Sequence, residues 1–406
     1  MGGVWREGNV TSAERRIDQS KRTVGIGMLG YGMMGRAHSS AFVRLPHAFW
    51  PPPINPRLVA VAARSAEKVS DMAARFGYAA WYERWEDLVA DPRVELLDNG
   101  GPNHLHAEPS IAAAKAGKHV ICEKPLARNA AEAYRMLEAV RATGVKHMCG
   151  FNYRFLPAIR QAKQMVEEGR LGRILQLRAR YLQSSLADPA LPFRWRMDRE
   201  LAGSGVLGDL GSHIVDLARF LAGEPTGVLG RMGTFFDRRP REDDSTRFEQ
   251  VTTDDAFQAL VEFENGATGV LEASKVALGN LNRLELELNG TEGSIRFNLE
   301  RMNELEVYFR KDEGSSLAGF RQVNVMNVGH PFAANWFPRH PLGWEQTFVH
   351  ELAHLLDAIA GNTDIGPYGA TFEDGYRAAV VCDAIAASAE SGSRIKVEYA
   401  SPEERP

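Results

Sequence analysis

The chain has 406 residues, and at about 100 to 200 residues per domain this length predicts two or three domains with sizeable cores. Lys and Arg number 48 against 52 Asp and Glu, so no excess of cations is present to hold a nucleic-acid backbone. No uncharged apolar run reaches the roughly 18 to 20 residues that cross a bilayer. The 3 cysteines are odd in number and widely spaced, as in reduced cytoplasmic proteins. We expect a cytoplasmic protein that binds neither nucleic acid nor membrane.

The chain divides into three regions by its patterning. Residues 1–22 are polar and charged, and we expect a mobile extension there. Residues 23–151 alternate short apolar runs with amphipathic stretches, which predicts strand and helix in turn and therefore a parallel sheet covered on both faces. Residues 47–56, HAFWPPPINP, interrupt this alternation, and their prolines predict a surface loop in the first crossover.

Residues 152–406 have a different texture. A helix and a glycine-dense helical stretch at 203–222 are followed by runs with period two, which argue for a largely antiparallel sheet with one face covered. Two amphipathic helices, at about 344–360 and 372–390, are expected to pack beside the first domain. The predicted fold class is α/β: an N-terminal Rossmann domain with a doubly wound parallel sheet, then an α+β domain with a large, mostly antiparallel open sheet.

A glycine-rich turn follows the first predicted strand and precedes a helix. In this context the glycines allow a tight turn, a close approach to a pyrophosphate, and close packing of helix on strand. A purely structural glycine turn is the alternative. The residues predicted to bind a dinucleotide here are Gly30, Tyr31, Gly32, Met33, Met34 and Gly35.

The end of the second predicted strand bears on the choice of cofactor. NAD enzymes usually present a carboxylate to the adenosine ribose at this point. This chain has Arg64 and Ser65 instead, which would accommodate a 2′-phosphate, so the sequence favours NADP(H) over NAD(H). Alternatively, Arg64 is a solvated loop residue or stacks on the adenine.

Two further loops follow predicted strands, PNHLH from Pro102 and EKP from Glu123. Loops at the carboxyl ends of parallel strands line the ligand crevice, so both are expected to face the cofactor. This places Lys124 near the nicotinamide, although a lysine at a strand end is more often a solvated cation. The residues of these loops predicted to bind cofactor are Pro102, Asn103, His106, Glu123 and Lys124.

The stretch from Ala202 to Gly223 combines glycines with helical spacing. Asp209, His213 and Asp216 fall at i, i+4 and i+7 on one face. The glycines at 203, 205, 208 and 211 cost a helix about 1 kcal/mol each relative to Ala, a cost easier to understand if a ligand or another backbone comes close. An imidazole can take the proton of an alcohol, and a carboxylate one turn away can orient it. His213 is therefore a predicted catalytic base, with a solvated polar stripe as the alternative.

These motifs together resemble the glucose-fructose oxidoreductase, inositol dehydrogenase and rhizopine-catabolism family, Gfo/Idh/MocA. The resemblance runs from about Val24 to Tyr399, and EKP followed by DxxxH is its specific part. It implies that Lys124, Asp209 and His213 form the catalytic set. The implied reaction is reversible hydride transfer between NAD(P) and a secondary hydroxyl of a sugar or polyol, with no metal required.

Within the family, the stretch from Tyr181 to His213 looks most like the sugar-oxidising subgroup of levoglucosan dehydrogenases, with inositol dehydrogenases as relatives. A homo-oligomer, a dimer or a tetramer, is expected through the open sheet of the second domain. Side chains that could bind a hydroxyl-rich ring, in addition to Asp209 and His213, are Asn152, Tyr153, Arg154, Gln183, Trp195 and Arg196.

Two competing readings remain. His350 to His354 spell HExxH, the helical arrangement that binds zinc in metallopeptidases, with Glu373 as a possible third ligand. The same segment carries an amphipathic stripe, so we expect a packing helix rather than a zinc hydrolase. The second is a regulator of the same fold that binds NAD(P) and sugar without turnover. Such proteins tend to lose the catalytic Lys or His, and both are present here.

Overall fold

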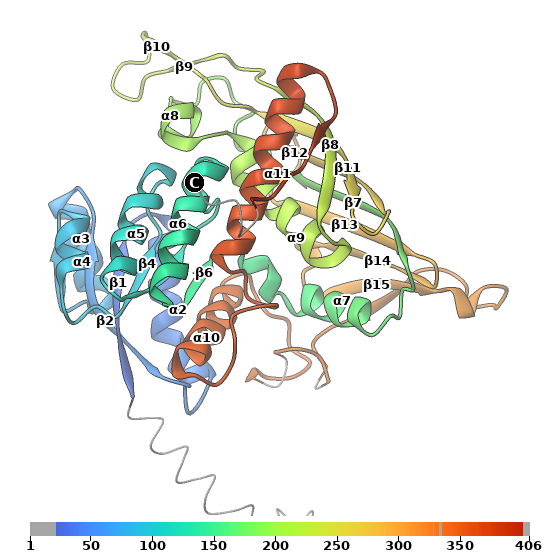
Figure 1. The fold of residues 1–406 in the computed structure, drawn as a ribbon, viewed down its shortest axis with the longest axis horizontal. Helices are drawn as coiled ribbons and strands as arrows, with labels where there is room; N and C mark the ends of the chain where they lie inside the picture. The colour runs from blue at the N-terminus through green and yellow to red at the C-terminus, as the bar shows by residue number, and fades with distance from the viewer. Residues whose placement is uncertain (1–21, 328, 333–334, 401–406) are drawn as a thin grey trace, which may run out of the picture.

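The structure, a computed structural model, describes residues 22–327, 329–332 and 335–400, so the predicted N-terminal extension lies almost entirely outside the described residues. Its N-terminal part is a six-stranded parallel sheet in the order β3-β2-β1-β4-β5-β6 (Figure 1). The strand order reverses between β1 and β4, where ligands bind in open α/β sheets. The strands are β1 (Thr23–Leu29), β2 (Asn55–Ala62), β3 (Ala80–Tyr82), β4 (Leu96–Asn99), β5 (His119–Cys122) and β6 (His147–Cys149).

Both faces of this sheet are covered, as the sequence predicts. Ile121 of β5 packs into one apolar core with Phe42, while its neighbour Val120 packs into another with Leu137. Successive strand residues point to opposite faces, so helices must cover both. They are α2 (Met33–Ala48), α3 (Ala66–Phe76), α4 (Trp85–Ala90), α5 (Ala107–Lys115) and α6 (Ala130–Thr143).

The predicted loop at 47–56 is shorter than expected. Helix α2 continues to Ala48 with Pro46 in its last turn, and β2 begins at Asn55. The helix survives the proline because fully buried Leu45 anchors its end in the core and because its carbonyl accepts the N–H of Phe49. Only the six residues between α2 and β2 form the connection.

The C-terminal domain is built on a nine-stranded sheet in the order β16-β15-β14-β13-β7-β12-β11-β8-β17. Neighbouring strands in this sheet are antiparallel, except that β7 and β12 are parallel to each other. The sheet is therefore mixed but mostly antiparallel. The strands are β7 (Ile174–Leu182), β8 (Pro225–Gly233), β11 (Ala256–Phe263), β12 (Thr268–Ser274), β13 (Arg283–Gly290), β14 (Gly293–Asn298), β15 (Glu304–Phe309), β16 (Arg321–Asn324) and β17 (Ile395–Lys396). A separate ribbon pairs β9 (Arg238–Pro240) with β10 (Phe248–Gln250).

Helices of the second half of the chain join the two sheets. Figure 1 shows α10 beside α2 and α11 crossing between α6 and the second sheet, where it packs on β8. No helix in the described part of the chain is long and apolar enough to cross a membrane. The helices are α7 (Pro157–Glu167), α8 (Arg199–Ala202), α9 (Ser212–Ala222), α10 (Gln346–Ala360) and α11 (Phe372–Ser391).

Candidate functional site

The glycine-rich turn has the backbone geometry that a bound pyrophosphate needs. Gly30 has a φ of 106°, and a Cβ on Gly35 would lie 2.2 Å from the Gly30 carbonyl oxygen, so only glycine fits at either position. Gly32 caps α2 without a side-chain bond, faces open space, and no acid lies in the first turn of the helix. The N–H groups there can therefore receive an anion. Around them Tyr31 and Met34 are half-buried and Met33 is exposed.

The segment predicted to read the ribose stands at the end of β2. Arg64 is exposed. The Ser65 hydroxyl accepts the N–H of Lys68 at 3.5 Å and so caps α3. Burial, together with the charges of Arg64 and Arg128, lowers the pKa of His104. Arg64 thus lies close enough to the PNHLH loop to act on it electrostatically, while Ser65 already serves as a helix cap.

The PNHLH loop is tied to its surroundings by side chains that we expected to bind cofactor. Asn103, which follows half-buried Pro102, donates from Nδ2 to the Ala202 carbonyl at 2.8 Å. His106 is buried, with Nδ1 2.8 Å from the Pro125 carbonyl and Nε2 3.0 Å from the Gly101 carbonyl. Burial lowers the pKa of His106, so the ring is neutral and its one N–H donates to one of these two carbonyls. His106 thus joins the PNHLH and EKP loops, and its contact with a cofactor stays a prediction.

Glu123 also lies behind the crevice and not in it. It is buried, and its Oε1 is 3.1 Å from His38 Nε2, while its Oε2 accepts the N–H of Lys124 at 3.1 Å. His38 Nδ1 lies 2.9 Å from Asp98 Oδ2. Burial alone would lower the pKa of His38, but the two carboxylates raise it well above its ordinary value, so the ring is an imidazolium that donates to both. The Glu123 carboxylate thus supports the Lys124 backbone, and its contact with a cofactor stays a prediction.

Lys124 and Asp209 meet although 85 residues separate them. Lys124 Nζ donates to Asp209 Oδ1 at 2.7 Å and to the Asp209 carbonyl at 2.9 Å. Lys275 Nζ donates to the other carboxylate oxygen, Oδ2. Burial would raise the pKa of Asp209, but Lys124, Lys275 and Arg196 hold it well below its ordinary value. The carboxylate therefore stays ionised between two ammonium groups.

His213 lies in the first turn of α9, next to this cluster. Its ring centre is 4.4 Å from that of Tyr153, 6.0 Å from that of Phe151 and 6.2 Å from that of Tyr181. Burial and the charge of Lys124 lower the pKa of His213 well below its ordinary value, against the opposite effect of Asp209. The imidazole is therefore neutral near pH 7 and able to accept a proton.

The glycines before this histidine are explained by neighbouring backbone. Gly203 has a φ of 83°, and a Cβ there would lie 2.2 Å from the Arg128 carbonyl oxygen. A Cβ on Gly205 would lie 2.1 Å from the Asp254 carbonyl oxygen, and the Asp254 carboxylate accepts the Gly205 N–H at 2.7 Å. Of the two possibilities raised by the sequence, ligand or backbone, a backbone comes close at both positions.

The predicted helical stretch 203–222 becomes helical at Val206 and continues to Ala222, with a π turn near its start. Helix α8 ends at Ala202, a π-helical turn spans Leu207–Gly211, and α9 begins at Ser212. Asp209 lies in the π turn. Such turns, with one extra residue per hydrogen-bonded ring, are frequent at functional sites.

A chain of hydrogen bonds extends from the aromatic wall of His213. The Tyr181 hydroxyl donates to Asn282 Oδ1 at 2.7 Å and lies 2.7 Å from the Tyr153 hydroxyl. Gln183 Nε2 donates to the same Asn282 oxygen at 2.7 Å. Two predicted substrate residues, Tyr153 and Gln183, thus belong to one polar network. Tyr181 and Asn282 are the other two members of this network. Neither was predicted as a site residue, because neither lies in a chemical motif.

Trp195 and Arg196 form the remaining predicted pair. The Arg196 guanidinium lies 4.2 Å from the Trp195 ring centre, and His104 meets that ring edge-on with centres 6.5 Å apart. The charge of Arg196 also helps to hold down the pKa of Asp209, after the larger effects of burial and the two lysines. This pair therefore lies beside the Lys124–Asp209–Lys275 cluster.

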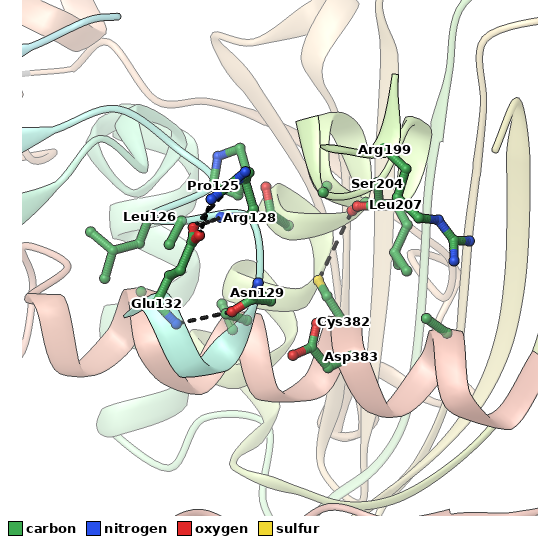
Figure 2. A pocket seen from close by; sticks show the side chains of 18 of the residues that line it. Pro125, Leu126, Arg128, Asn129, Glu132, Arg199, Ser204, Leu207, Cys382 and Asp383 are labelled. Carbon is green, nitrogen blue, oxygen red and sulfur yellow. Dashed lines mark hydrogen bonds and ion pairs between the residues drawn. The ribbon is translucent and has the colours of Figure 1, made fainter. Parts of the chain in front are cut away.

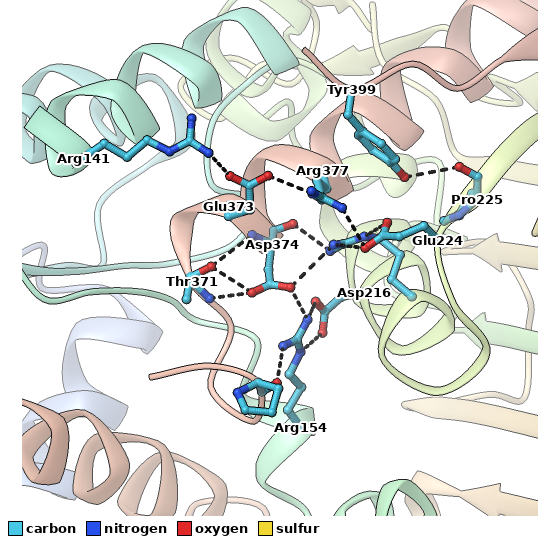
Figure 3. A network of polar contacts seen from close by, with 12 residues as sticks. Arg141, Arg154, Asp216, Glu224, Pro225, Thr371, Glu373, Asp374, Arg377 and Tyr399 are labelled. Carbon is cyan, nitrogen blue, oxygen red and sulfur yellow. Dashed lines mark hydrogen bonds and ion pairs between the residues drawn. The ribbon is translucent and has the colours of Figure 1, made fainter. Parts of the chain in front are cut away.

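Arg154 and Asn152 do not face the site, which corrects two predicted substrate contacts. Figure 3 shows Arg154 inside a buried network, where Nη2 and Nε meet Asp216 at 2.6 and 2.8 Å and Nη2 meets Asp374 at 3.1 Å. Asp216, expected on the chemical face of its helix, is thus a structural partner. Asn152 donates to the Thr347 hydroxyl at 2.8 Å and ties the chain to α10.

The HExxH motif lies on α10 with its side chains in separate environments. His350 accepts the Trp336 indole N–H on Nε2 at 2.6 Å, and its Nδ1 is 3.1 Å from the Phe155 carbonyl. His354 Nε2 is 2.7 Å from the Ile365 carbonyl. Glu351 is fully buried, and Glu373 forms ion pairs with Arg141 and Arg377. The motif forms a packing helix, as expected, and does not assemble a zinc-binding arrangement.

A cavity of about 420 Å³ is lined by residues of the EKP loop, the π turn and α11 (Figure 2). Pro125, Gly208 and Ser212 line it, and each is the sequence neighbour of Lys124, Asp209 or His213. The cavity is closed on its far side by α11 through Ala378, Cys382 and their neighbours.

Comparisons with known proteins match both halves of the chain. Residues 24–151 match the family model described as "Oxidoreductase family, NAD-binding Rossmann fold", and residues 159–296 match "GFO/IDH/MocA C-terminal domain". Levoglucosan dehydrogenase of Pseudarthrobacter phenanthrenivorans is 39% identical over 93% of this chain and 98% of its own. Myo-inositol 2-dehydrogenase of Thermotoga maritima is 28% identical over 71% of this chain and 79% of its own. A solved levoglucosan dehydrogenase complex with NADH and levoglucosan superimposes with a TM-score of 0.88 at 40% identity, covering 93% of this chain and 100% of that one.

Proposed function

The chain belongs to the Gfo/Idh/MocA family of NAD-binding oxidoreductases, and on this premise we propose that Lys124, Asp209 and His213 are its catalytic group. The reaction is hydride transfer between a nicotinamide and a secondary hydroxyl of a sugar, anhydrosugar or polyol. The observation that carries this proposal is the meeting of Lys124 with Asp209, at 2.7 Å, one helical turn before a buried, neutral histidine.

The proposed chemistry assigns one task to each side chain. A bound nicotinamide supplies the acceptor for the hydride. His213 accepts the hydroxyl proton as the C–H bond breaks with its electron pair, so the alcohol becomes a carbonyl. Lys124 donates a hydrogen bond to the reacting oxygen and stabilises the negative charge that develops there. Asp209 holds Lys124 in position through two of its donors. The glycine-rich turn would hold the pyrophosphate by its N–H groups.

Among sugars, we propose an anhydrosugar of the levoglucosan type as the first substrate to test. The relative of 39% identity carries that name over almost its whole length. The network of Tyr153, Tyr181, Asn282 and Gln183 offers donors and acceptors in a row, and Trp195 offers a flat apolar face. A ring that carries several hydroxyls suits both features. Inositols are the second class to test, since an inositol dehydrogenase is also a relative.

For the cofactor, we propose that the protein accepts NADP(H) as well as NAD(H), with Arg64 facing the 2′-phosphate. Arg64 is exposed, and no carboxylate lies among the residues from Ala63 to Ala66 that would repel this group. The solved relative cited above is a complex with NADH. Replacement of Arg64 by Ala separates the two cofactors: it should raise KM for NADP⁺ and leave KM for NAD⁺ nearly unchanged. Equal changes for both would refute this role.

The experiment that tests the function follows the absorbance of reduced nicotinamide. Purified protein is mixed with NAD⁺ or NADP⁺ and with levoglucosan, glucose, xylose or an inositol. We expect turnover in the wild type, and at least about a hundredfold loss of kcat in His213→Ala and Lys124→Met, because general acid–base catalysis contributes about 10² to 10⁴. NADH binding, followed by its fluorescence, should persist in both variants. Turnover that survives His213→Ala would refute the assignment.

We further propose that the protein is cytoplasmic and forms a homo-oligomer, a dimer or a tetramer. We also propose that the boundary between its two domains lies near residue 151. The three cysteines are free and buried, which fits a reducing compartment. Leu229, Leu260 and Val270 lie opposite one another on three adjacent strands and are all exposed. A row of exposed apolar side chains on an open sheet favours pairing with a second copy. Mass measurement in solution tests this, and a monomer would refute it.

A further inference from the structure

Lys275 is a buried lysine whose ammonium reaches the proposed catalytic group. It follows the last residue of β12, and only 8% of its surface is exposed. Its backbone is fixed on both sides, because its N–H donates to the Asp255 carbonyl at 3.0 Å and its own carbonyl accepts the Leu186 N–H at 2.9 Å. In the described part of the chain, its Nζ bonds one group, Asp209 Oδ2.

A purely structural role explains this arrangement poorly. One carboxylate needs one cation, and Lys124 already neutralises Asp209. Lys275 also acts on the buried carboxyl of Asp254, but the oxygens of Asp254 accept the N–H groups of Gly205 and Leu207 and form no ion pair with Lys275 in the described residues. The two ammonium groups thus share direct contact with one carboxylate, and burying a charge without a full partner is costly. The same surplus is useful where negative charge develops on a reacting oxygen. Arg196 increases the positive field at Asp209.

We propose that Lys275 is a positioning residue for the reaction proposed above, on which this inference rests. By holding Oδ2, Lys275 fixes the Asp209 carboxylate, so that Oδ1 and the Asp209 carbonyl bind Lys124 in one orientation. Two N–H groups of Lys124 are then occupied, and the third remains for the substrate oxygen. By balancing the charge of Asp209, Lys275 also keeps His213 neutral and able to accept a proton.

The charged and titratable groups around these side chains are few. Asp209 is faced by Lys124, Lys275 and Arg196, and its charge acts on the Tyr181 hydroxyl. Lys275 acts in addition on the buried carboxyl of Asp254. His213 is faced by Lys124 and Asp209 and is flanked by the rings of Tyr153, Tyr181 and Phe151. Both lysines thus bear on His213, Lys124 directly and Lys275 through Asp209. Removal of Lys275 leaves Asp209 less balanced and favours the protonated form of His213.

The test compares Lys275→Met, Lys275→Gln and Lys275→Arg with the wild type on the best substrate of the sugar panel. For Lys275→Met we expect kcat to fall about tenfold to a hundredfold, the range for a lost hydrogen bond to a charged group. The acidic limb of kcat/KM should move to higher pH, and the dissociation constant of NADH should stay within about twofold of the wild type. Lys275→Arg should restore most of kcat. Lys275→Gln also lacks the charge, so it should behave like Lys275→Met. It serves as the test variant if Lys275→Met does not fold.

Lys118→Met is the matched control. Lys118 is also 8% exposed, and its ammonium binds the Asp91 and Val94 carbonyls, remote in sequence from Asp209. The Lys118→Met variant should be less stable than the wild type, but its pH profile of kcat/KM should not move. If the profiles of Lys275→Met and Lys275→Gln match the wild type, or if Lys118→Met moves in the same way, the inference is overturned. A wild type without turnover on any sugar would instead remove the proposed function itself.

Discussion

Arg154→Met probes the buried network of Figure 3 and the correction made to the predicted substrate set. Arg154 is 2% exposed, and its guanidinium binds both oxygens of Asp216, which is 1% exposed. Met keeps an apolar stem of similar length but loses the guanidinium, whose carbon lies 4.7 Å from the Phe220 ring centre. The change therefore removes the charge and three ion-pair bonds, two to Asp216 and one to Asp374.

The expected cost follows from what each carboxylate retains. Asp374 still accepts the Thr371 N–H at 2.8 Å and lies 3.5 Å from Arg219, whereas Asp216 loses both of its bonds to the Arg154 guanidinium. Breaking a buried ion pair by removing one partner costs about 3 to 5 kcal/mol, and we expect a value in this range. Measurement is by urea unfolding, with the midpoint shift read at unchanged slope.

The loss of stability in Arg154→Met should also depend on pH. Burial raises the pKa of Asp216, and Arg154 opposes this effect, so in the variant the pKa rises further. A carboxyl whose pKa is higher in the folded than in the unfolded protein destabilises the protein while it is ionised. The free energy of unfolding therefore rises as the pH falls through the folded pKa. The difference from wild type should therefore shrink on acidification.

Two results would refute this reasoning. Arg141→Met changes an exposed arginine that is paired with Glu138 at 3.1 Å and with Glu373. This variant should cost about 1 kcal/mol or less, because exposed ion pairs contribute little. A loss equal to that of Arg154→Met would show that burial does not set the cost. A variant of Arg154 with unchanged stability and a raised KM for sugar would return Arg154 to the substrate site.

Three further predictions concern other parts of the molecule. Glu351→Met should raise the free energy of unfolding by about 1 to 3 kcal/mol, because both buried carboxyl oxygens of Glu351 lack partners within the described residues. Thermal denaturation measures this change in stability, and a destabilised variant would contradict the prediction. Gly35→Ala should weaken NADH binding at least about tenfold, since its Cβ would lie 2.2 Å from the Gly30 carbonyl oxygen; unchanged titration of NADH fluorescence would be evidence against this geometry. Burial lowers the pKa of His147 to about 4, so protonation favours unfolding, and stability should fall as the pH drops from about 6.5 through 4. His147→Asn should flatten that slope in unfolding curves recorded across this range, and an unaltered slope would assign it to other groups.

Local patterns were sufficient for the elements of the first sheet. Alternating apolar and amphipathic runs predict βα units, and Ser65 and Asn129 cap their helices as such residues do. The direction of strand pairing is not encoded in the same way. The period-two pattern of β7 and β12 is compatible with either orientation, so their parallel pairing follows from the path of the chain between them.

The candidate site was predictable only where residues lie in a motif. Lys124, Asp209 and His213 could be predicted as site residues because their spacing and context are distinctive, and the structure brings Lys124 and Asp209 together. Lys275 follows an apolar strand with no marker, and its partner lies 66 residues away. Arg154 was misassigned because its neighbour Tyr153 does face His213, while its own partner Asp374 is 220 residues distant. Long-range pairing of single side chains leaves no trace in local periodicity.

The docking of the chain's last third on the first sheet has a consequence for dissecting the protein. The edge strand β6 finds its partner there, since the Cys149 N–H donates to the Ala370 carbonyl at 2.7 Å and His147 accepts the Phe372 N–H at 3.1 Å. Helix α10 likewise covers α2. A fragment ending near residue 151 would present a bare strand edge and an uncovered apolar helix, both of which promote aggregation. The nucleotide-binding half is therefore separable as a stretch of sequence but not as an independently soluble piece, and expression of that fragment alone should yield insoluble material unless residues 346–391 are supplied in trans.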